Sequence, residues 1–152
     1  MPIEQLPKST YAYCASAALC LNFATTRADI PTVSAEVAMK ADGRQYDWSN
    51  KRTFQFTQAE LAEFCAFLFF PKGQRRWIHR SPSGETKSFQ VSIDGPNVLA
   101  ELSAPGFCGR IPVIPRDQYL LRNFGLSRLV QGQPQLSNDH HLQSLQQLAS
   151  SF

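Results

Sequence analysis

The sequence predicts an α+β fold in which two tandem units of antiparallel strands each end in a helix. Two observations support this prediction. Apolar residues alternate with a period of two over much of the chain, and the period changes to helical spacing after residue 56; the same order of strands and then a helix start recurs in the second half. With 152 residues, 43% hydrophobic and 18% charged, the chain has enough apolar material for one ordinary domain and is not typical of a disordered protein.

The first unit, residues 10–71, begins with stretches that alternate in the manner of half-buried strands. One strand is predicted over Tyr11 to Phe23, where the odd positions are apolar, and a second over Val33 to Lys40. The second stretch runs into Asp42-Gly43, a dipeptide typical of β-hairpin turns. A further strand or strand pair is predicted beyond this turn, because four aromatic residues share one parity: Tyr46, Trp48, Phe54 and Phe56.

A helix is predicted to begin after Thr57, where the period changes. Thr57 and Glu60 have the spacing of a capping box, in which each side chain bonds to the other residue's backbone N–H. Pro71 and Gly73 end the helix. Between these signals an apolar stripe lies at helical spacing and comprises Leu61, Phe64, Cys65 and Leu68.

The second unit, residues 72–130, repeats this order. Alternation predicts strands over Phe89–Ile93 and Val98–Leu102, followed by a short strand over Arg110–Ile114. A helix is then predicted from Pro115 to about Val130, because proline suits the first turn of a helix. The two halves share little identity, so the alternative stays open that any α+β domain can produce two strand-rich stretches that each end in a helix.

The predicted domain, residues 10–130, lies between a flexible N-terminus of residues 1–9 and a flexible tail of residues 131–152. Three leucines at helical spacing allow a short helix in the tail. No signal peptide is recognisable at the start of the sequence. The longest dense apolar run, Leu61 to Phe70, is about half as long as a membrane span. No membrane partner is therefore expected.

Four scattered cysteines and three histidines have the spacing of neither a zinc site nor a compact disulfide framework. Reduced thiols and a cytoplasmic location are the prediction. The sequence also lacks a recognisable nucleophile–histidine pairing, a dinucleotide-binding glycine pattern and a phosphate-binding loop. We therefore expect a protein that is not an enzyme, with no catalytic residues, no metal and no cofactor.

The charge of the chain is unevenly distributed. Residues 1–71 hold six Lys/Arg and seven Asp/Glu, whereas residues 72–131 hold nine Lys/Arg and four Asp/Glu. Basic groups neutralise phosphates and an aromatic ring can stack on any base, so a basic stretch that includes a tryptophan favours nucleic-acid binding. The alternative is a solvated hairpin with the tryptophan in the core. The leading candidates in this stretch are Arg75, Arg76, Trp77, Arg80 and Lys87.

A second candidate cluster precedes the first predicted helix. Aromatic and basic residues would alternate on one sheet face if the two rings pointed outward, whereas rings that pointed inward would be ordinary core. The cluster comprises Lys40, Arg44, Tyr46, Trp48, Lys51 and Arg52. Arg110, with Phe107 nearby, occupies the corresponding part of the second unit, since an offset of 58 residues places it over Arg52.

The order of elements resembles a single-stranded DNA-binding superfamily, that of the plant Whirly proteins and the eukaryotic positive-cofactor coactivator. The resemblance covers about residues 10–130 and is carried by Val33 to Phe70, with Val98 to Val130 as a second, degenerate copy. It implies curved antiparallel sheets packed through their helices, with nucleic acid across the exposed sheet faces. The lysine-glycine-lysine motif of the plant Whirly proteins is absent from this chain.

These observations lead to a functional prediction: a sequence-tolerant protein that binds single-stranded nucleic acid, DNA in the first place, and acts in transcription, replication or DNA transfer. RNA remains open as a partner, because discrimination through the 2′-hydroxyl depends on local geometry. A homo-oligomer is expected, since relatives of this fold commonly assemble. The alternative is a protein-interaction or assembly module of a mobile element that does not bind nucleic acid directly.

Overall fold

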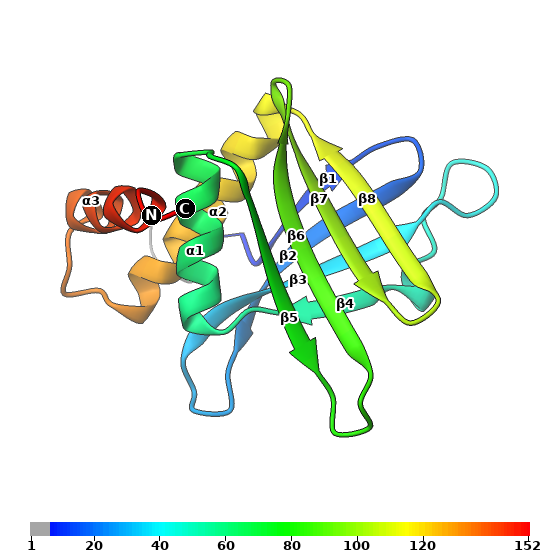
Figure 1. Cartoon of the computed structure of the whole chain (residues 1–152), viewed down its shortest axis with the longest axis horizontal. Helices are drawn as coiled ribbons and strands as arrows, with labels where there is room; N and C mark the ends of the chain where they lie inside the picture. Colours follow the sequence, from blue (N-terminus) through cyan, green and yellow to red (C-terminus); the bar gives the residue numbers. More distant parts are fainter. Residues whose placement is uncertain (1–6) are drawn as a thin grey trace.

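The computed structural model describes residues 7–152, which form two antiparallel four-stranded sheets and three α-helices (Figure 1). The predicted flexible N-terminus falls largely on residues 1–6, which lie outside the described residues, and the first strand already begins at Ser9. The N-terminal sheet pairs its strands in sequence order: β1 (Ser9–Tyr13), β2 (Ala17–Thr25), β3 (Pro31–Met39) and β4 (Arg52–Gln55).

The C-terminal sheet has the same sequential order. Its strands are β5 (Gln74–Arg80), β6 (Thr86–Asp94), β7 (Asn97–Ala104) and β8 (Phe107–Val113). Each sheet is followed by a helix, α1 (Gln58–Phe69) after β4 and α2 (Pro115–Gly132) after β8. The two sheets cross each other, with the helices gathered at one end (Figure 1). The predicted α+β fold of two tandem units is thereby confirmed.

The start of α1 forms as its local sequence predicts. The Thr57 hydroxyl accepts a hydrogen bond from the Glu60 backbone N–H at 3.2 Å, and the Glu60 carboxylate accepts one from the Thr57 N–H at 2.9 Å. These two bonds satisfy N–H groups that a helix end otherwise leaves unpaired. The capping box therefore sets the point at which the chain leaves the N-terminal sheet.

The C-terminal tail differs from the prediction of a flexible segment. Residues Asn138–Ala149 form a helix, α3, whose Ser137 cap accepts a hydrogen bond from the His140 N–H. Its Leu145 and Ala149 are buried, and α3 lies beside α1 (Figure 1). The apolar stripe that the leucine spacing predicted packs against α1, so α3 belongs to the folded unit.

The prediction of one strand from Tyr11 to Phe23 is wrong. A turn at Cys14–Ser16 divides the segment into β1 and β2, which pair with Tyr11 opposite Cys20. The turn reverses the chain and changes which parity faces the core. Odd residues of β2, such as Leu19, are fully buried, whereas Tyr11 and Tyr13 are 43% and 53% exposed.

The segment after the Asp42-Gly43 turn is likewise not a continuous strand. Tyr46 and Trp48 lie in the connection from β3 to β4, and Trp48–Asn50 form a 3₁₀ turn. The Asp47 carboxylate accepts hydrogen bonds from Ser49 and Asn50, both at 2.7 Å, and these bonds lower the pKa of Asp47. Only Arg52–Gln55 forms a strand, β4. Tyr46 and Trp48 therefore lie outside the core, whereas Phe54 and Phe56 are buried in it.

The core lies between the inner faces of the two sheets and α1. Phe89 on β6 is fully buried among other rings, with centroid separations of 5.5 Å to Phe56, 5.8 Å to Phe64 and 6.4 Å to Trp77. Buried aromatic pairs of this kind contribute beyond the area they remove from water. This cluster joins both sheets and α1 into one core.

Helix α2 is attached to the N-terminal sheet by Arg128. Its guanidinium donates hydrogen bonds to the carbonyl oxygens of Thr32 and Ala24, at 2.9 and 2.5 Å. The Phe124 ring stacks on Phe23 at a centroid distance of 4.5 Å. The helix of the second unit therefore covers the sheet of the first. No helix within residues 7–152 is long and apolar enough to cross a lipid bilayer.

Gly109 on β8 marks a close approach between the two sheets. A Cβ atom at this position would clash with Cγ1 of the fully buried Val37 and lie 3.3 Å from Sδ of Met39. We expect Gly109→Ala to lower the free energy of unfolding by about 1–3 kcal/mol, measured by urea denaturation, because overpacking forces neighbouring groups to shift.

The matched control for this prediction is the double variant Gly109→Ala with Val37→Ala, which removes the clashing methyl group. In a double-mutant cycle the two substitutions should cost less together than the sum of their separate effects. Simple additivity would show that the sheets do not meet at these two residues.

Candidate nucleic-acid interface

Four aromatic side chains lie together on the outer face of the N-terminal sheet. The rings of Tyr11 and Tyr13 are stacked, with centroids 5.7 Å apart and an interplanar angle of 3°. Trp48 meets Tyr11 edge-on at 6.0 Å, and Tyr46 lies 5.5 Å from Tyr13. We call these four residues the aromatic surface. Both β1 tyrosines are about half exposed, so part of each ring is accessible to a ligand.

Small residues on the neighbouring strands make room for the aromatic surface. Tyr13 pairs with Ala18, which pairs in turn with Ala38, so this row of the sheet carries methyl groups beside the ring. The Tyr46 hydroxyl donates a hydrogen bond to the Cys14 carbonyl oxygen at 2.7 Å and fixes the 40–50 connection to the β1–β2 turn. Partial burial raises the pKa of the Tyr13 phenol.

Cations lie around the aromatic surface, although not all are unpaired. The Lys40 ammonium is 4.5 Å from the centroid of the Tyr46 ring, within the range of a cation–π interaction. Lys51 forms an ion pair with Glu36 on β3. Arg44 is exposed in the loop after β3. Four members of the second candidate cluster are therefore brought together here, namely Lys40, Tyr46, Trp48 and Lys51. Arg52 faces another part of the molecule.

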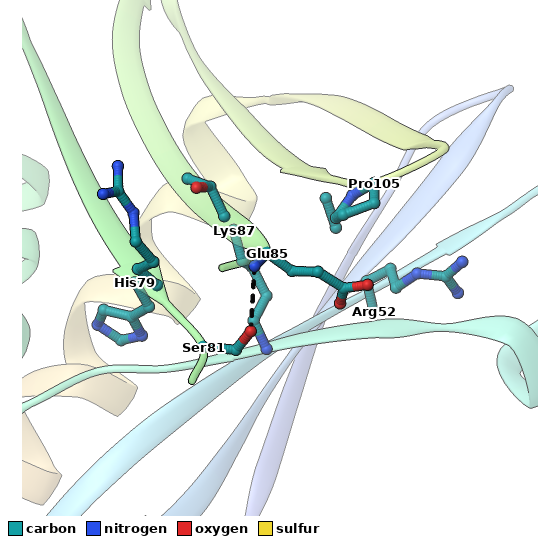
Figure 2. A pocket seen from close by; sticks show the side chains of 9 residues that line it. Arg52, His79, Ser81, Glu85, Lys87 and Pro105 are labelled. Carbon is teal, nitrogen blue, oxygen red and sulfur yellow. Dashed lines mark hydrogen bonds between the residues drawn. The ribbon is translucent and has the colours of Figure 1, made fainter. Parts of the chain in front are cut away.

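That other part is a cleft between the two sheets, with a volume of about 550 Å³ (Figure 2). Arg52 lines one side, and the hairpin between β5 and β6 lines the other. We call it the cationic cleft, because three cations and one histidine face a single carboxylate. Its lining residues are Arg52, His79, Arg80, Ser81, Glu85, Thr86, Lys87, Ala104 and Pro105.

Two of these cations also hold the cleft in shape. The Lys87 ammonium donates a hydrogen bond to the Thr53 carbonyl oxygen at 2.5 Å, which joins β6 to β4. The Arg52 guanidinium donates to the Asn50 carbonyl oxygen at 2.8 Å and lies over the Phe107 ring. Arg80 is exposed. Arg80 is thus the most accessible of the three cations in the cleft.

His79 forms the inner wall of the cationic cleft. Its ring stacks on Phe54 at 4.0 Å, and its Nε2 lies 2.9 and 3.1 Å from the two carboxylate oxygens of Glu60. The same Glu60 caps α1, so the cleft is connected directly to the helix start. This arrangement keeps the imidazole in place as part of the wall.

Two further candidates lie on the outer face of the C-terminal sheet. Arg76 and Arg110 belong to one cross-strand row, together with Gln90 and Glu101. Arg110 Nε donates a hydrogen bond to Glu101 Oε2 at 2.5 Å, and this interaction raises the pKa of Arg110. Arg76 is 3.4 Å from the Ser88 hydroxyl. This face carries two arginines, together with the exposed Ile78, but no aromatic ring among its described residues, so it offers phosphate contacts without base stacking.

The structure contradicts the expectation that Trp77 offers its ring to a base. Trp77 points inward from β5, is only 6% exposed and packs edge-on against Phe56 and Phe64. Arg75, on the same parity, forms an ion pair with Glu63 of α1 and lies over the Phe152 ring at 4.4 Å. These two residues stabilise the fold, because the inner face of β5 faces α1.

Sequence reasoning missed the two exposed rings of the aromatic surface, Tyr11 and Tyr13. It placed them on the apolar face of a single long strand, whereas the turn at Cys14–Ser16 turns them outward. One signal was available. Both are tyrosines, whose hydroxyl suits a half-exposed position, and small residues follow them at a point where a turn is permitted.

The described residues 7–152 contain no group of three or more His, Cys, Asp or Glu side chains that could hold a metal ion. The geometry defines a class of fold: two crossed antiparallel sheets, each followed by a helix, with aromatic rings and cations on the sheet surfaces. No protein-family model and no curated protein matches the sequence. Solved structures do match it.

The fold is that of the Whirly proteins. The structure of the plant transcriptional regulator PBF-2 superimposes with a TM-score of 0.70, at 18% identity, over 97% of each chain. WHY1 from Arabidopsis thaliana has a TM-score of 0.63 and 19% identity, over 80% of this chain and 82% of its own. WHY3 from the same plant has a TM-score of 0.63 and 17% identity, over 97% and 95%. At these identities the likeness establishes the fold.

Proposed function

We propose that this protein binds single-stranded DNA without strong sequence preference. One observation carries the proposal: in the aromatic surface, Tyr11 and Tyr13 are exposed on the outer face of a sheet, next to Tyr46 and Trp48, with Lys40 over the Tyr46 ring. Every base has a flat face that can stack on such rings, and each stacked base contributes about 1–3 kcal/mol. The fold shared with a plant transcriptional regulator supports the same reading.

The phosphate backbone would be held by cations on three surfaces. Lys40 borders the aromatic surface and Arg44 is exposed in the loop after β3. Arg52, Arg80 and Lys87 line the cationic cleft, and Arg76 and Arg110 lie on the outer C-terminal sheet. Phosphate contacts of this kind release counterions and do not read sequence. Of the proposed residues, Lys51, Arg75 and Arg110 are already paired with carboxylates, so we assign them smaller roles.

The direct test is titration of a fluorescent single-stranded oligonucleotide at about 50 mM and about 200 mM salt, since phosphate binding weakens steeply with salt. We expect binding at the lower concentration and clear weakening at the higher one. An RNA of the same sequence and a duplex serve as comparisons. Absence of binding at low salt, or an affinity indifferent to salt, would contradict the proposal.

Arg80→Ala should reduce the salt dependence of binding. Loss of one phosphate contact to a single strand changes the slope of log Kobs against log salt by about 0.7. The matched control is Arg27→Ala, which removes an arginine that is exposed between β2 and β3 and does not line the cleft. Equal slopes for the two variants would remove Arg80 from the interface.

We also propose that the chain forms a homo-oligomer through the start of α2. Four exposed apolar side chains lie at this end of the molecule: Ile93, Ile114, Tyr119 and Leu120. The Gln118 amide donates to the Pro96 carbonyl oxygen at 3.0 Å, so the start of α2 lies against the β6–β7 turn and the side chains can form one patch. Exposed apolar patches of this kind are typical of protein interfaces.

Leu120→Asp is expected to shift the mass measured by size-exclusion chromatography with light scattering toward that of a single chain, because a buried unpaired carboxylate is unfavourable. Ile78→Asp is the control, since Ile78 is 54% exposed on β5, away from α2. If Ile78→Asp lowered the mass and Leu120→Asp did not, the interface would lie elsewhere than at the start of α2.

Regulation of transcription, replication or DNA transfer is the biological role we attach to this binding. The comparison with PBF-2 favours transcription. A reducing, cytoplasm-like compartment fits the four cysteines, none of which is in a disulfide within the described residues.

A further inference from the structure

The tip of the β5–β6 hairpin carries a serine followed by proline in an accessible turn. Residues 80–86 are all exposed, and the hairpin extends away from the helices (Figure 1). The turn is held by two backbone hydrogen bonds, from Ser81 N–H to the Glu85 carbonyl oxygen at 2.8 Å and from Gly84 N–H to the Ser81 carbonyl oxygen at 2.9 Å. Serine before proline is the acceptor that proline-directed protein kinases require.

Ser81 is also part of the cationic cleft. Its hydroxyl lines the cleft together with Arg52, Arg80 and Lys87, and it accepts a hydrogen bond from the Glu85 backbone N–H at 3.2 Å (Figure 2). The second serine of the turn, Ser83, does not line the cleft and is followed by glycine. Ser81, unlike Ser83, therefore combines an accessible serine-proline sequence with cationic surroundings.

We propose that Ser81 is a phosphorylation site, and that its phosphate occupies the cationic cleft in place of a DNA phosphate. In the modification, Ser81 Oγ attacks the γ-phosphorus of a nucleoside triphosphate, the bond to the β-phosphate oxygen breaks, and a base of the kinase takes the hydroxyl proton. The nucleoside diphosphate leaves. The regulatory part of this inference rests on the proposed function; the acceptor site does not.

Charge explains why this modification would act on binding. A phosphoserine adds about −1.5 to −2 charges at neutral pH, together with three strong acceptor oxygens. Within the cleft it meets three cations and one carboxylate, Glu85, so it cancels most of the remaining positive charge. If two phosphate contacts are lost, the slope of log Kobs against log salt falls by about 1.4, at about 0.7 per contact.

The first experiment treats the full chain with a proline-directed serine kinase and ATP and maps the modified peptides by mass spectrometry. Incorporation at Ser81, and its loss in Ser81→Ala, is the expected result. Ser83→Ala should still be modified. A protein that takes up no phosphate at Ser81 overturns the site, whether or not it binds DNA.

The second experiment compares the unmodified chain with chains carrying genetically encoded phosphoserine at position 81 or at position 150, in the oligonucleotide titration. Ser150 is exposed at the end of α3 and gives the same net charge away from the cleft. We expect phosphoserine at 81 to weaken binding at least about tenfold at low salt and to lower the slope, with little change for position 150. Equal affinities for both modified chains overturn the regulation. An unmodified chain that does not bind contradicts the proposed function instead.

Discussion

Phe89→Ala is expected to lower the free energy of unfolding by about 3–5 kcal/mol, the range for truncation of a buried phenylalanine. Phe89 is fully buried on β6 and touches rings from both sheets and from α1, so its removal leaves a cavity that no single element can fill. Urea denaturation should show a lower midpoint with an unchanged slope.

The control is Ile78→Ala on the neighbouring strand β5. Ile78 is 54% exposed, and substitutions at such positions usually change stability by less than about 0.5 kcal/mol. A Phe89→Ala variant that loses no more stability than Ile78→Ala would mean that the two sheets and α1 do not share one core. In that case the surfaces assigned to DNA would not hold fixed positions relative to one another.

Tyr13→Ala combined with Trp48→Ala should have the largest effect on DNA binding. Each ring that stacks on a base is worth about 1–3 kcal/mol, which is about 5- to 150-fold in affinity for each ring. The substitutions lie on the outer face, where Tyr13 is 53% exposed, so thermal unfolding should change little. Affinity is measured with the same fluorescent oligonucleotide at low salt.

Trp77→Phe is the matched control for this pair. Trp77 is 6% exposed and packs on Phe56 and Phe64, so the conservative change should reduce stability and leave DNA affinity unchanged. If Trp77→Phe weakened binding as much as the double variant, the aromatic surface would be the wrong interface. A double variant that folds and binds normally would lead to the same conclusion.

Local features of the chain were predictable because neighbouring residues produce them. The capping box of Thr57 and Glu60 depends on two residues three positions apart, and it forms as expected. The change from period two to helical spacing placed α1 correctly, Pro115 marked the start of α2, and the repeated order of strands and helix indicated the two-unit fold. These signals are local, so no knowledge of the partner surface was needed.

The direction of individual side chains depended on long-range packing. Tyr11 and Tyr13 were expected inside and lie outside, whereas Trp77 was expected to be available and is buried. A period-two pattern states which residues share a face but not which face meets the core, and one unrecognised turn exchanges the two. Two cations expected to be available are likewise paired within the fold: Arg75 forms an ion pair with Glu63 of α1, and Lys87 donates a hydrogen bond to the Thr53 carbonyl oxygen of β4.

By itself, therefore, the sequence determined the class of fold, the two-unit order and the residue types from which a DNA-binding surface could be built. The tertiary structure alone decided which rings are exposed, which cations are already paired, and that Arg52 and the β5–β6 hairpin form one cleft. The reason is physical: alternation and capping act between near neighbours, whereas exposure and pairing depend on segments far apart in the chain that meet only after folding.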